Sequence, residues 1–208
     1  MKKLLLASDG SLVISRGYQS FGIPNDKLNI AYITTAAKGV IDKGYLKRHK
    51  DAMRRKGLRF EELDIEGKGV REFKRFLEDK NLIHIEGGNT FYLLKALREN
   101  GLDTTLIERV KNGLAYVGTS AGAYIACPTI EVAAWGPIPK DRCGVTDYTA
   151  LNLVPFVLKV HYTDDMKTLV KEKISSCPYK VRILRDGQGI LVEGSHYQLL
   201  GKNKEVKL

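Results

Sequence analysis

Short apolar runs alternate with amphipathic stretches through the first 120 residues of this 208-residue chain. Each apolar run has the length of a buried strand, and each stretch between them has the period of a helix. The expected strands are 2–8, 28–34, 61–65, 81–86 and 114–118, and the expected helices are 38–56, 70–78, 90–100 and 104–112. Because parallel strands need a crossover, usually a helix, the alternation predicts a mostly parallel sheet covered on both faces.

The last third of the chain has shorter elements. A strand at 157–161 and a helix at 164–175 precede short strands, with turns at Asp186–Gly187 and Glu193–Gly194. We find no internal repeat or linker, so we predict one domain over residues 1–208. The expected fold is a three-layer, doubly wound α/β protein with a C-terminal hairpin, in which functional residues gather at the carboxyl ends of the strands.

The composition narrows the class of protein. The chain is 43% hydrophobic and 28% charged, and its three Cys lack any C-x-x-C spacing, which argues against a disulfide framework or a thiolate zinc site. The apolar run at 4–7 is far too short for a signal peptide or a membrane span. We therefore expect a cytoplasmic protein that neither crosses nor binds a membrane.

An excess of basic residues raises the question of an anionic partner. Lys and Arg number 34 against 24 Asp and Glu, a net charge of +10. The densest basic run, 47–56, lies in a helical pattern without interleaved aromatic residues, so it offers no platform for stacking bases. We expect a solvated basic helix and no nucleic-acid partner, with a polyanion site as the alternative.

The motif Gly118-Thr119-Ser120-Ala121-Gly122 has the form G-x-S-x-G and lies between an expected strand and an expected helix. In a nucleophile elbow, small residues permit a strained turn that lifts the serine hydroxyl clear of the sheet. The motif predicts Ser120 as a nucleophile; the alternative is a tight turn in which Ser120 caps a helix.

A second motif, Gly87-Gly88-Asn89-Thr90, follows the preceding expected strand and opens a helix. Paired glycines before a helix let backbone N–H groups face an anion. We predict an oxyanion hole made by the Gly88 and Ala121 N–H groups, with Asn89 and Thr90 binding substrate. The alternatives are a plain turn capped by Asn89 and a phosphate site, although no Walker lysine or G-x-G-x-x-G is present.

A serine nucleophile needs a base, and the chain has four His. His49 lies in the charged helix and is expected to be solvated, His84 lies in a strand and is expected in the core, and His196 lies near the end. His161 closes an apolar run and should reach the sheet edge that carries Ser120, so it is the predicted base.

The third member of a triad is a carboxylate that orients the imidazole. Between Ser120 and the base, the acids are Glu131, Asp141 and Asp147. Asp147 lies in a turn-like segment shortly before the strand that carries the base, and it is the predicted acid, with Glu131 or no acid as the alternative.

These motifs, with 127–130, 150–153 and His161-Tyr162-Thr163 in the same order, make the chain resemble the peptidase E family of S51-type serine peptidases. The resemblance extends from the first strand to about residue 176. It implies a fold similar to the class I glutamine amidotransferase domain, which is flavodoxin-like, and a kinship with aspartyl dipeptidases and cyanophycinases. By motif it assigns Ser120 as nucleophile, His161 as base, and Gly88 with Ala121 as oxyanion donors.

The chain departs from the aspartyl dipeptidases in two places. Their triad Asp lies fifteen residues after the nucleophile, where this chain has Trp135, and here the interval from serine to histidine is four residues longer. Their arginine-bearing segment after the histidine corresponds to 163–171, which has Lys but no Arg. Because Lys does not copy the bidentate hydrogen bonds of Arg to a carboxylate, the sequence does not predict aspartyl specificity.

The sequence as a whole predicts a serine peptidase that acts on a small peptide or amide without metal or organic cofactor, as a monomer or homodimer. Two rival functions are a small esterase and a catalytically silent homologue that binds an acidic partner.

Overall fold

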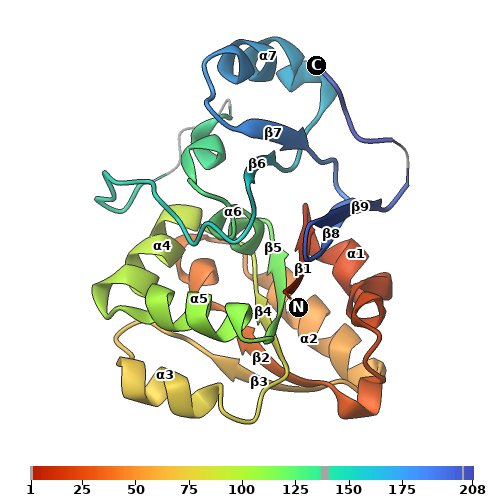
Figure 1. Cartoon of the computed structure of the whole chain (residues 1–208), viewed down its shortest axis with the longest axis vertical. Helices are drawn as coiled ribbons and strands as arrows, with labels where there is room; N and C mark the ends of the chain where they lie inside the picture. Colours follow the sequence, from red (N-terminus) through yellow and green to blue (C-terminus); the bar gives the residue numbers. More distant parts are fainter. Residues whose placement is uncertain (1, 137–140, 203) are drawn as a thin grey trace.

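The computed structural model describes residues 2–136, 141–202 and 204–208. Its central seven-stranded sheet has the order β3-β2-β4-β5-β1-β8-β9 (Figure 1). The first five strands in that order are mutually parallel, and β8 and β9 are antiparallel to their neighbours. The strands are β1 Lys3–Ala7, β2 Asn29–Ile33, β3 Arg59–Leu63, β4 Leu82–Ile85, β5 Ala115–Thr119, β8 Gly189–Glu193 and β9 His196–Leu200. The predicted mostly parallel α/β sheet is confirmed.

Helices cover both faces of this sheet because alternate strand residues point to opposite sides. Leu4 and Leu6 of β1 belong to one hydrophobic cluster, whereas Leu5 and Ala7 belong to the other. The first cluster takes in α3 Val70–Phe76, α4 Thr90–Glu99, α5 Leu102–Lys111 and α6 Ala121–Ile125. The second takes in the N-terminal helical segment and α2 Gly44–Arg55. The predicted three layers are therefore present.

Two local features differ from the sequence-based expectation. The helix expected at 38–56 begins only with α2, since residues 40–43 are not helical and Thr35–Gly39 forms a separate 3-10 helix; just before α2 the Asp42 carboxylate accepts the Gly44 N–H at 2.8 Å. A helical segment that we did not predict follows β1 and consists of α1 Gly10–Leu12, a π-helical turn Val13–Gly17 and a 3-10 turn Tyr18–Phe21.

The strand that precedes His161 lies outside the central sheet. β6 Phe156–Lys159 pairs in parallel with β7 Lys180–Ile183 in a separate two-stranded sheet. Between them the chain forms a 3-10 turn, Asp164–Met166, and α7 Lys167–Ser175. Figure 1 shows β6, β7 and α7 together at one end of the molecule, above the central sheet. The position of His161 therefore depends on how this unit packs against the sheet.

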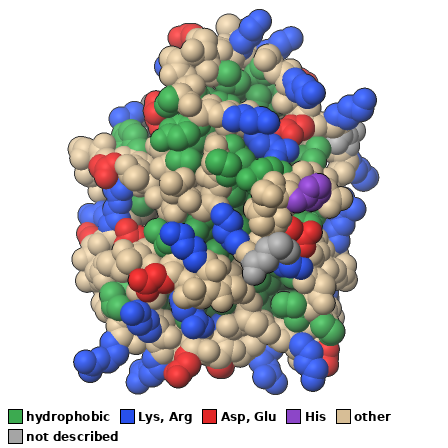
Figure 2. Space-filling model, viewed as in Figure 1, with side chains coloured by type: hydrophobic (Ala, Val, Ile, Leu, Met, Phe, Trp, Pro, Cys, Tyr) green, Lys and Arg blue, Asp and Glu red, His purple; other side chains and the backbone are tan. Residues whose placement is uncertain are grey.

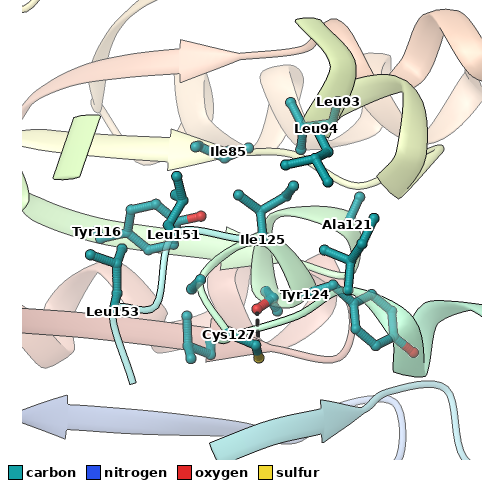
Figure 3. Packing of buried hydrophobic residues seen from close by; sticks show 14 of the residues in the cluster. Ile85, Leu93, Leu94, Tyr116, Ala121, Tyr124, Ile125, Cys127, Leu151 and Leu153 are labelled. Carbon is teal, nitrogen blue, oxygen red and sulfur yellow. Dashed lines mark hydrogen bonds between the residues drawn. The ribbon is translucent and has the colours of Figure 1, made fainter. Parts of the chain in front are cut away.

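Helix α6 follows the G-x-S-x-G motif directly and is buried along its whole length. Ala121, Tyr124 and Ile125 pack among apolar side chains from β4, α4, β5 and the 151–153 segment (Figure 3). A 3-10 turn, Glu131–Ala134, follows it. Because a close-packed core resists displacement, this packing holds the preceding residue, Ser120, in one position.

The basic residues of α2 are largely paired. Lys47 and Arg54 both contact Asp51, and Lys50 contacts Glu62 at 2.8 Å. On the face drawn in Figure 2, Lys and Arg side chains are spread around the surface with acidic residues among them. Within the part of the chain that the structure describes, no helix is long and apolar enough to cross a membrane.

Candidate active site

Ser120 occupies a strained turn at the carboxyl end of β5. Its φ of 49° and ψ of −102° lie in a region that residues with a side chain rarely adopt. The Ser120 N–H donates to the Ala7 carbonyl of β1 at 3.0 Å, which ties the turn to the neighbouring strand. A side chain at Gly122 would collide with the Ile85 backbone of β4. The G-x-S-x-G motif therefore forms the tight strand-to-helix turn that its small residues predict.

His161 lies within hydrogen-bond distance of this serine. Its Nε2 is 2.8 Å from Ser120 Oγ, so the structure brings the predicted nucleophile and the predicted base together. The His161 backbone also has a positive φ, 55°. Its N–H donates to the hydroxyl of buried Ser8 at 2.9 Å, which anchors this strained residue to the end of β1.

The carboxylate at the other side of the imidazole belongs to Asp186. Its Oδ1 is 2.6 Å from His161 Nδ1 and also accepts the Ser8 hydroxyl at 2.8 Å. The hydrogen bond from His161, helped by the charge of that imidazole and by Ser8, holds the pKa of Asp186 below its usual value. Asp186 lies in the turn before β8. Because β8 is antiparallel to β1, it begins at the sheet edge where the parallel strands end.

This geometry corrects the prediction that Asp147 is the acid. The Asp147 carboxylate contacts Arg98 at 3.0 Å and accepts the Thr149 N–H, and its side chain is 67% exposed. Among the described residues, neither Asp147 nor the alternative Glu131 makes a hydrogen bond to His161. The prediction considered only acids between Ser120 and His161, whereas the carboxylate that contacts His161 follows it in the chain.

The predicted substrate-binding residues Asn89 and Thr90 are not brought into the pocket that contains Ser120. Asn89 caps α4, with its side-chain oxygen accepting the N–H groups of Phe91 and Tyr92, and its amide donates to the Asp141 carbonyl at 2.9 Å. Thr90 is 1% exposed, and its hydroxyl has no partner among the described residues. The alternative in which Asn89 is a helix cap is correct.

The two predicted oxyanion donors flank Ser120. A side chain at Gly87 would bring its Cβ within 3.2 Å of Ser120 Cβ, so the Gly87–Gly88 loop lies against the serine. No hydrogen bond within the described part of the chain uses the N–H of Gly88 or of Ala121. Both groups are therefore available to a bound ligand.

Ser120 and His161 open into a pocket of about 340 Å³. Its charged lining comprises the carboxylates of Asp9, Asp42 and Glu86 and the side chains of Arg48 and His49. Each carboxylate accepts a backbone N–H: Asp9 from Gly187, Asp42 from Gly44 and Glu86 from Gly87. Arg48 makes no ion pair with any described residue. Among the described residues, the guanidinium of Arg48 thus has no ion-pair partner in this lining.

His49 is not the solvated residue that its charged helix suggested. Its Nδ1 lies 2.8 Å from the Glu86 carboxylate, which is fully buried and also accepts the Tyr32 hydroxyl at 2.6 Å. Although burial alone raises the pKa of Glu86, hydrogen bonds from His49 and Tyr32 and the charges of His49 and His84 lower it to about 2. Since the ionised carboxylate is only an acceptor, His49 Nδ1 carries a proton. Positions 45, 48 and 49 have the spacing that puts side chains on one face of a helix, and this spacing was the sequence signal that could have placed His49 with Tyr45 and Arg48 at the pocket.

His84 is buried, as predicted. Its Nδ1 is 2.7 Å from the Tyr18 hydroxyl, and its Nε2 is 2.8 Å from the Thr119 hydroxyl. Burial lowers the pKa of His84 to about 4. His84 therefore stays neutral near pH 7. Its contact Thr119 is the residue that precedes Ser120.

The described residues contain no cluster of three or more His, Cys, Asp or Glu that could hold a metal ion. The arrangement at the sheet edge is a serine, an imidazole and a carboxylate in a row, beside two free backbone donors. This is the set of groups that acyl transfer through a serine needs.

Comparison with known proteins gives the family. The model of peptidase family S51 matches residues 20–200. An uncharacterised peptidase of Pasteurella multocida is 31% identical over 207 residues, which cover 98% of this chain and all of that protein. Peptidase E of Escherichia coli is 34% identical over 137 residues, 61% of this chain and 58% of that protein. The chain therefore belongs to peptidase family S51, as its motifs predicted, and its class of activity is that of a peptidase.

Solved structures agree with this assignment. The crystal structure of a "Putative Peptidase E Protein" from Listeria monocytogenes EGD-e matches with a TM-score of 0.85 and 29% identity, covering 98% of this chain and 100% of that one. A peptidase from an acI-B1 Actinobacterium matches with a TM-score of 0.69 at 18% identity, covering 97% of this chain and 88% of that one. The second likeness shows the fold alone.

Proposed function

We propose that this chain is a serine peptidase that cleaves small peptides, of the dipeptide class, through an acyl-enzyme on Ser120. The observation that carries the proposal is the position of His161 between Ser120 and Asp186, at 2.8 and 2.6 Å. A free serine hydroxyl is too weakly acidic to attack a carbonyl near pH 7, so it needs a base in this position.

The reaction proceeds in two halves. Ser120 Oγ attacks the scissile carbonyl carbon while its proton passes to His161 Nε2, and the oxyanion accepts the Gly88 and Ala121 N–H groups. His161 then gives that proton to the amine as the C–N bond breaks. A water molecule attacks the resulting ester, its proton passes to His161, and Ser120 leaves with a proton regained from the imidazole. Asp186 holds the Nδ1–H tautomer throughout.

The pocket suits a small substrate. A volume of about 340 Å³ lies at the lower end of ordinary ligand sites. Arg48, without a protein carboxylate as partner, is placed to bind a carboxylate of the substrate, and every dipeptide carries one at its C-terminus. No metal or organic cofactor takes part in this scheme. We also propose a single catalytic domain that works away from membranes and nucleic acids, in the cytoplasm, as a monomer or homodimer.

The test is covalent labelling by a fluorophosphonate probe, read by mass spectrometry of the intact protein and of its peptides. One adduct on the peptide that contains Ser120, lost in Ser120→Ala and in His161→Gln, is expected. The matched control is Ser11→Ala, which removes a hydroxyl that hydrogen-bonds Asp9 instead of the His161 imidazole. Absence of any adduct at saturating probe would contradict the proposal and favour a catalytically silent binding protein. A dipeptide and ester panel, run in parallel, separates a peptidase from an esterase.

A further inference from the structure

Helix α2 contacts the Gly87–Gly88 loop and Glu86, the residue before it, through two side chains. Tyr45 of α2 donates its hydroxyl to the Gly87 carbonyl at 2.7 Å. One turn later, His49 contacts Glu86, and the two rings meet edge to face with centroids 5.8 Å apart. Two side chains on one helix face therefore brace the loop that carries a predicted oxyanion donor.

The peptide groups before Gly87 and after Gly88 are held by other bonds. The Gly87 N–H donates to the Glu86 carboxylate at 2.9 Å, and the Asn89 N–H donates to the Ala36 carbonyl at 2.9 Å. The peptide group between Gly87 and Gly88 has only one anchor among the described residues, the Tyr45 hydroxyl on its oxygen. Its N–H has none.

That peptide group is intrinsically free to turn. Gly88 has a φ of 145°, and a side chain there would collide with the Ala36 backbone, so only glycine fits. Two adjacent glycines also allow the peptide plane between them to rotate with little steric cost. Because C=O and N–H point in opposite directions across a trans peptide, fixing the Gly87 oxygen on Tyr45 fixes the direction of the Gly88 N–H.

Resting on the proposed function, we propose that Tyr45 is a positioning residue that pre-orients the Gly88 N–H as an oxyanion donor. Burial and the nearby carboxylates of Glu86 and Asp42 raise the pKa of Tyr45, so its hydroxyl remains a donor across the working pH range. Orienting a donor before the reaction stabilises the transition state without reorganisation during the step. Tyr45 touches neither the reacting atoms nor the nucleophile in this role.

The experiment compares Tyr45→Phe with wild type, using the fluorophosphonate, whose phosphoryl oxygen occupies the oxyanion hole. Loss of an entire oxyanion donor costs about 10²–10³-fold in rate, and loss of its anchor alone should cost less, about 10–30-fold in the maximal inactivation rate. The dissociation constant of the initial complex should stay within about twofold, because only the transition state uses the donor. A general loosening of α2 would move both constants.

The matched control is Tyr92→Phe, which removes the hydroxyl that contacts exposed Glu66 from the neighbouring helix α4. It should label like wild type. A crystal structure of Tyr45→Phe should show the Gly87–Gly88 peptide turned or in two orientations. An unchanged inactivation rate, a rise in the dissociation constant that parallels the fall in rate, or an unmoved peptide would each overturn the proposal. A wild type that is not labelled contradicts the proposed function instead, and the variant's crystal structure still decides whether Tyr45 fixes the peptide.

Discussion

Asp186 Oδ1 lies 2.6 Å from His161 Nδ1, although the two residues are 25 positions apart and lie in separate connecting segments, His161 after β6 and Asp186 between β7 and β8. His161 follows β6 in the small sheet, whereas Asp186 precedes β8 in the central one. The Ser8 hydroxyl joins them, because it accepts the His161 N–H and donates to the carboxylate. The contact between His161 and Asp186 therefore joins the segment that follows β6 to the turn that leads from the small sheet into the central one.

This relationship predicts the effect of Asp186→Asn. The amide keeps the shape of the carboxylate but can no longer stabilise the imidazolium, and it favours the wrong tautomer. We expect the rate of labelling at Ser120 to fall by about 10²–10⁴-fold. Asp147→Asn is the matched control, because it neutralises an exposed carboxylate paired with Arg98, and it should label within about twofold of wild type. A time course of labelling measures both rates. A larger loss of rate in Asp147→Asn than in Asp186→Asn would restore Asp147 as the acid.

Ser8→Ala should affect both rate and stability. The substitution removes the acceptor of the part-buried His161 N–H, and loss of one such hydrogen bond typically costs about 0.5–1.5 kcal/mol in the free energy of unfolding. It also removes the hydrogen bond that the Ser8 hydroxyl donates to Asp186. Because Asp186 then holds the His161 imidazole less firmly, we expect labelling of Ser120 to be about 10-fold slower. Urea unfolding and labelling rates on one preparation measure the two effects. The control is Ser15→Ala, which removes a surface hydroxyl bonded to the Leu12 carbonyl and should change neither the stability nor the labelling rate. Equal behaviour of the two variants would contradict the role of the Ser8 hydroxyl as a link between His161 and Asp186.

Burial of His84 predicts a pH-dependent stability. Its pKa of about 4 in the folded state lies below the ordinary value of 6.5, so the unfolded chain binds more protons between these values. The free energy of unfolding should therefore fall as the pH is lowered from 6.5 toward 4, by roughly 3 kcal/mol. Glu86, with a pKa of about 2 against 4.5, adds its own loss as the pH falls from about 4.5 toward 2, so it overlaps only the lower end of that window.

Urea unfolding between pH 4.5 and 7 measures this slope. In His84→Gln, which is neutral throughout, the slope should flatten whatever its overall stability. His196→Gln, at an exposed position of β9, should keep the slope of wild type. If the free energy of unfolding of His84→Gln still fell with pH as in wild type, groups other than His84 would be responsible for the dependence.

The free guanidinium of Arg48 predicts a preference among peptides. Arg48→Gln should raise the KM for a dipeptide substrate about 10-fold, since charge-assisted hydrogen bonds contribute about 1.5–3 kcal/mol. The KM for the same dipeptide with an amidated C-terminus should change little. Lys47→Gln removes a neighbouring positive charge whose side chain is 82% exposed, and serves as the control. Equal increases in KM for the free and the amidated dipeptide would show that Arg48 does not bind the C-terminal carboxylate of the substrate.

The local sequence predicted most of the elements, the elbow and the histidine that contacts Ser120. Alternating apolar runs and helical periods predicted the five parallel strands. In β1, β2, β4 and β5 both faces are buried, and such strands leave a continuous apolar run in the sequence; β3 lies at the sheet edge and has no buried residue. Ser120 was predictable because its turn requires small residues at fixed spacing. Gly88 and Ala121 followed from the ends of neighbouring strands. His161 was the remaining histidine at a strand end, although its strand lies in another sheet.

Only the tertiary structure decided the acid and the shape of the pocket. Asp186 joins the site because β8 runs antiparallel beside β1 and so begins at the catalytic edge, and strand direction is a property of pairing, not of the residues. Asn89 and Thr90 follow a glycine pair as substrate ligands could, but the direction of α4 turns them to a helix cap and the core. His49 was predicted to be solvated because its helix is charged, but the packing of α2 against the Gly87–Gly88 loop brings it to Glu86. Spacing along a chain predicts local geometry, whereas contacts between distant segments depend on packing that no short stretch encodes.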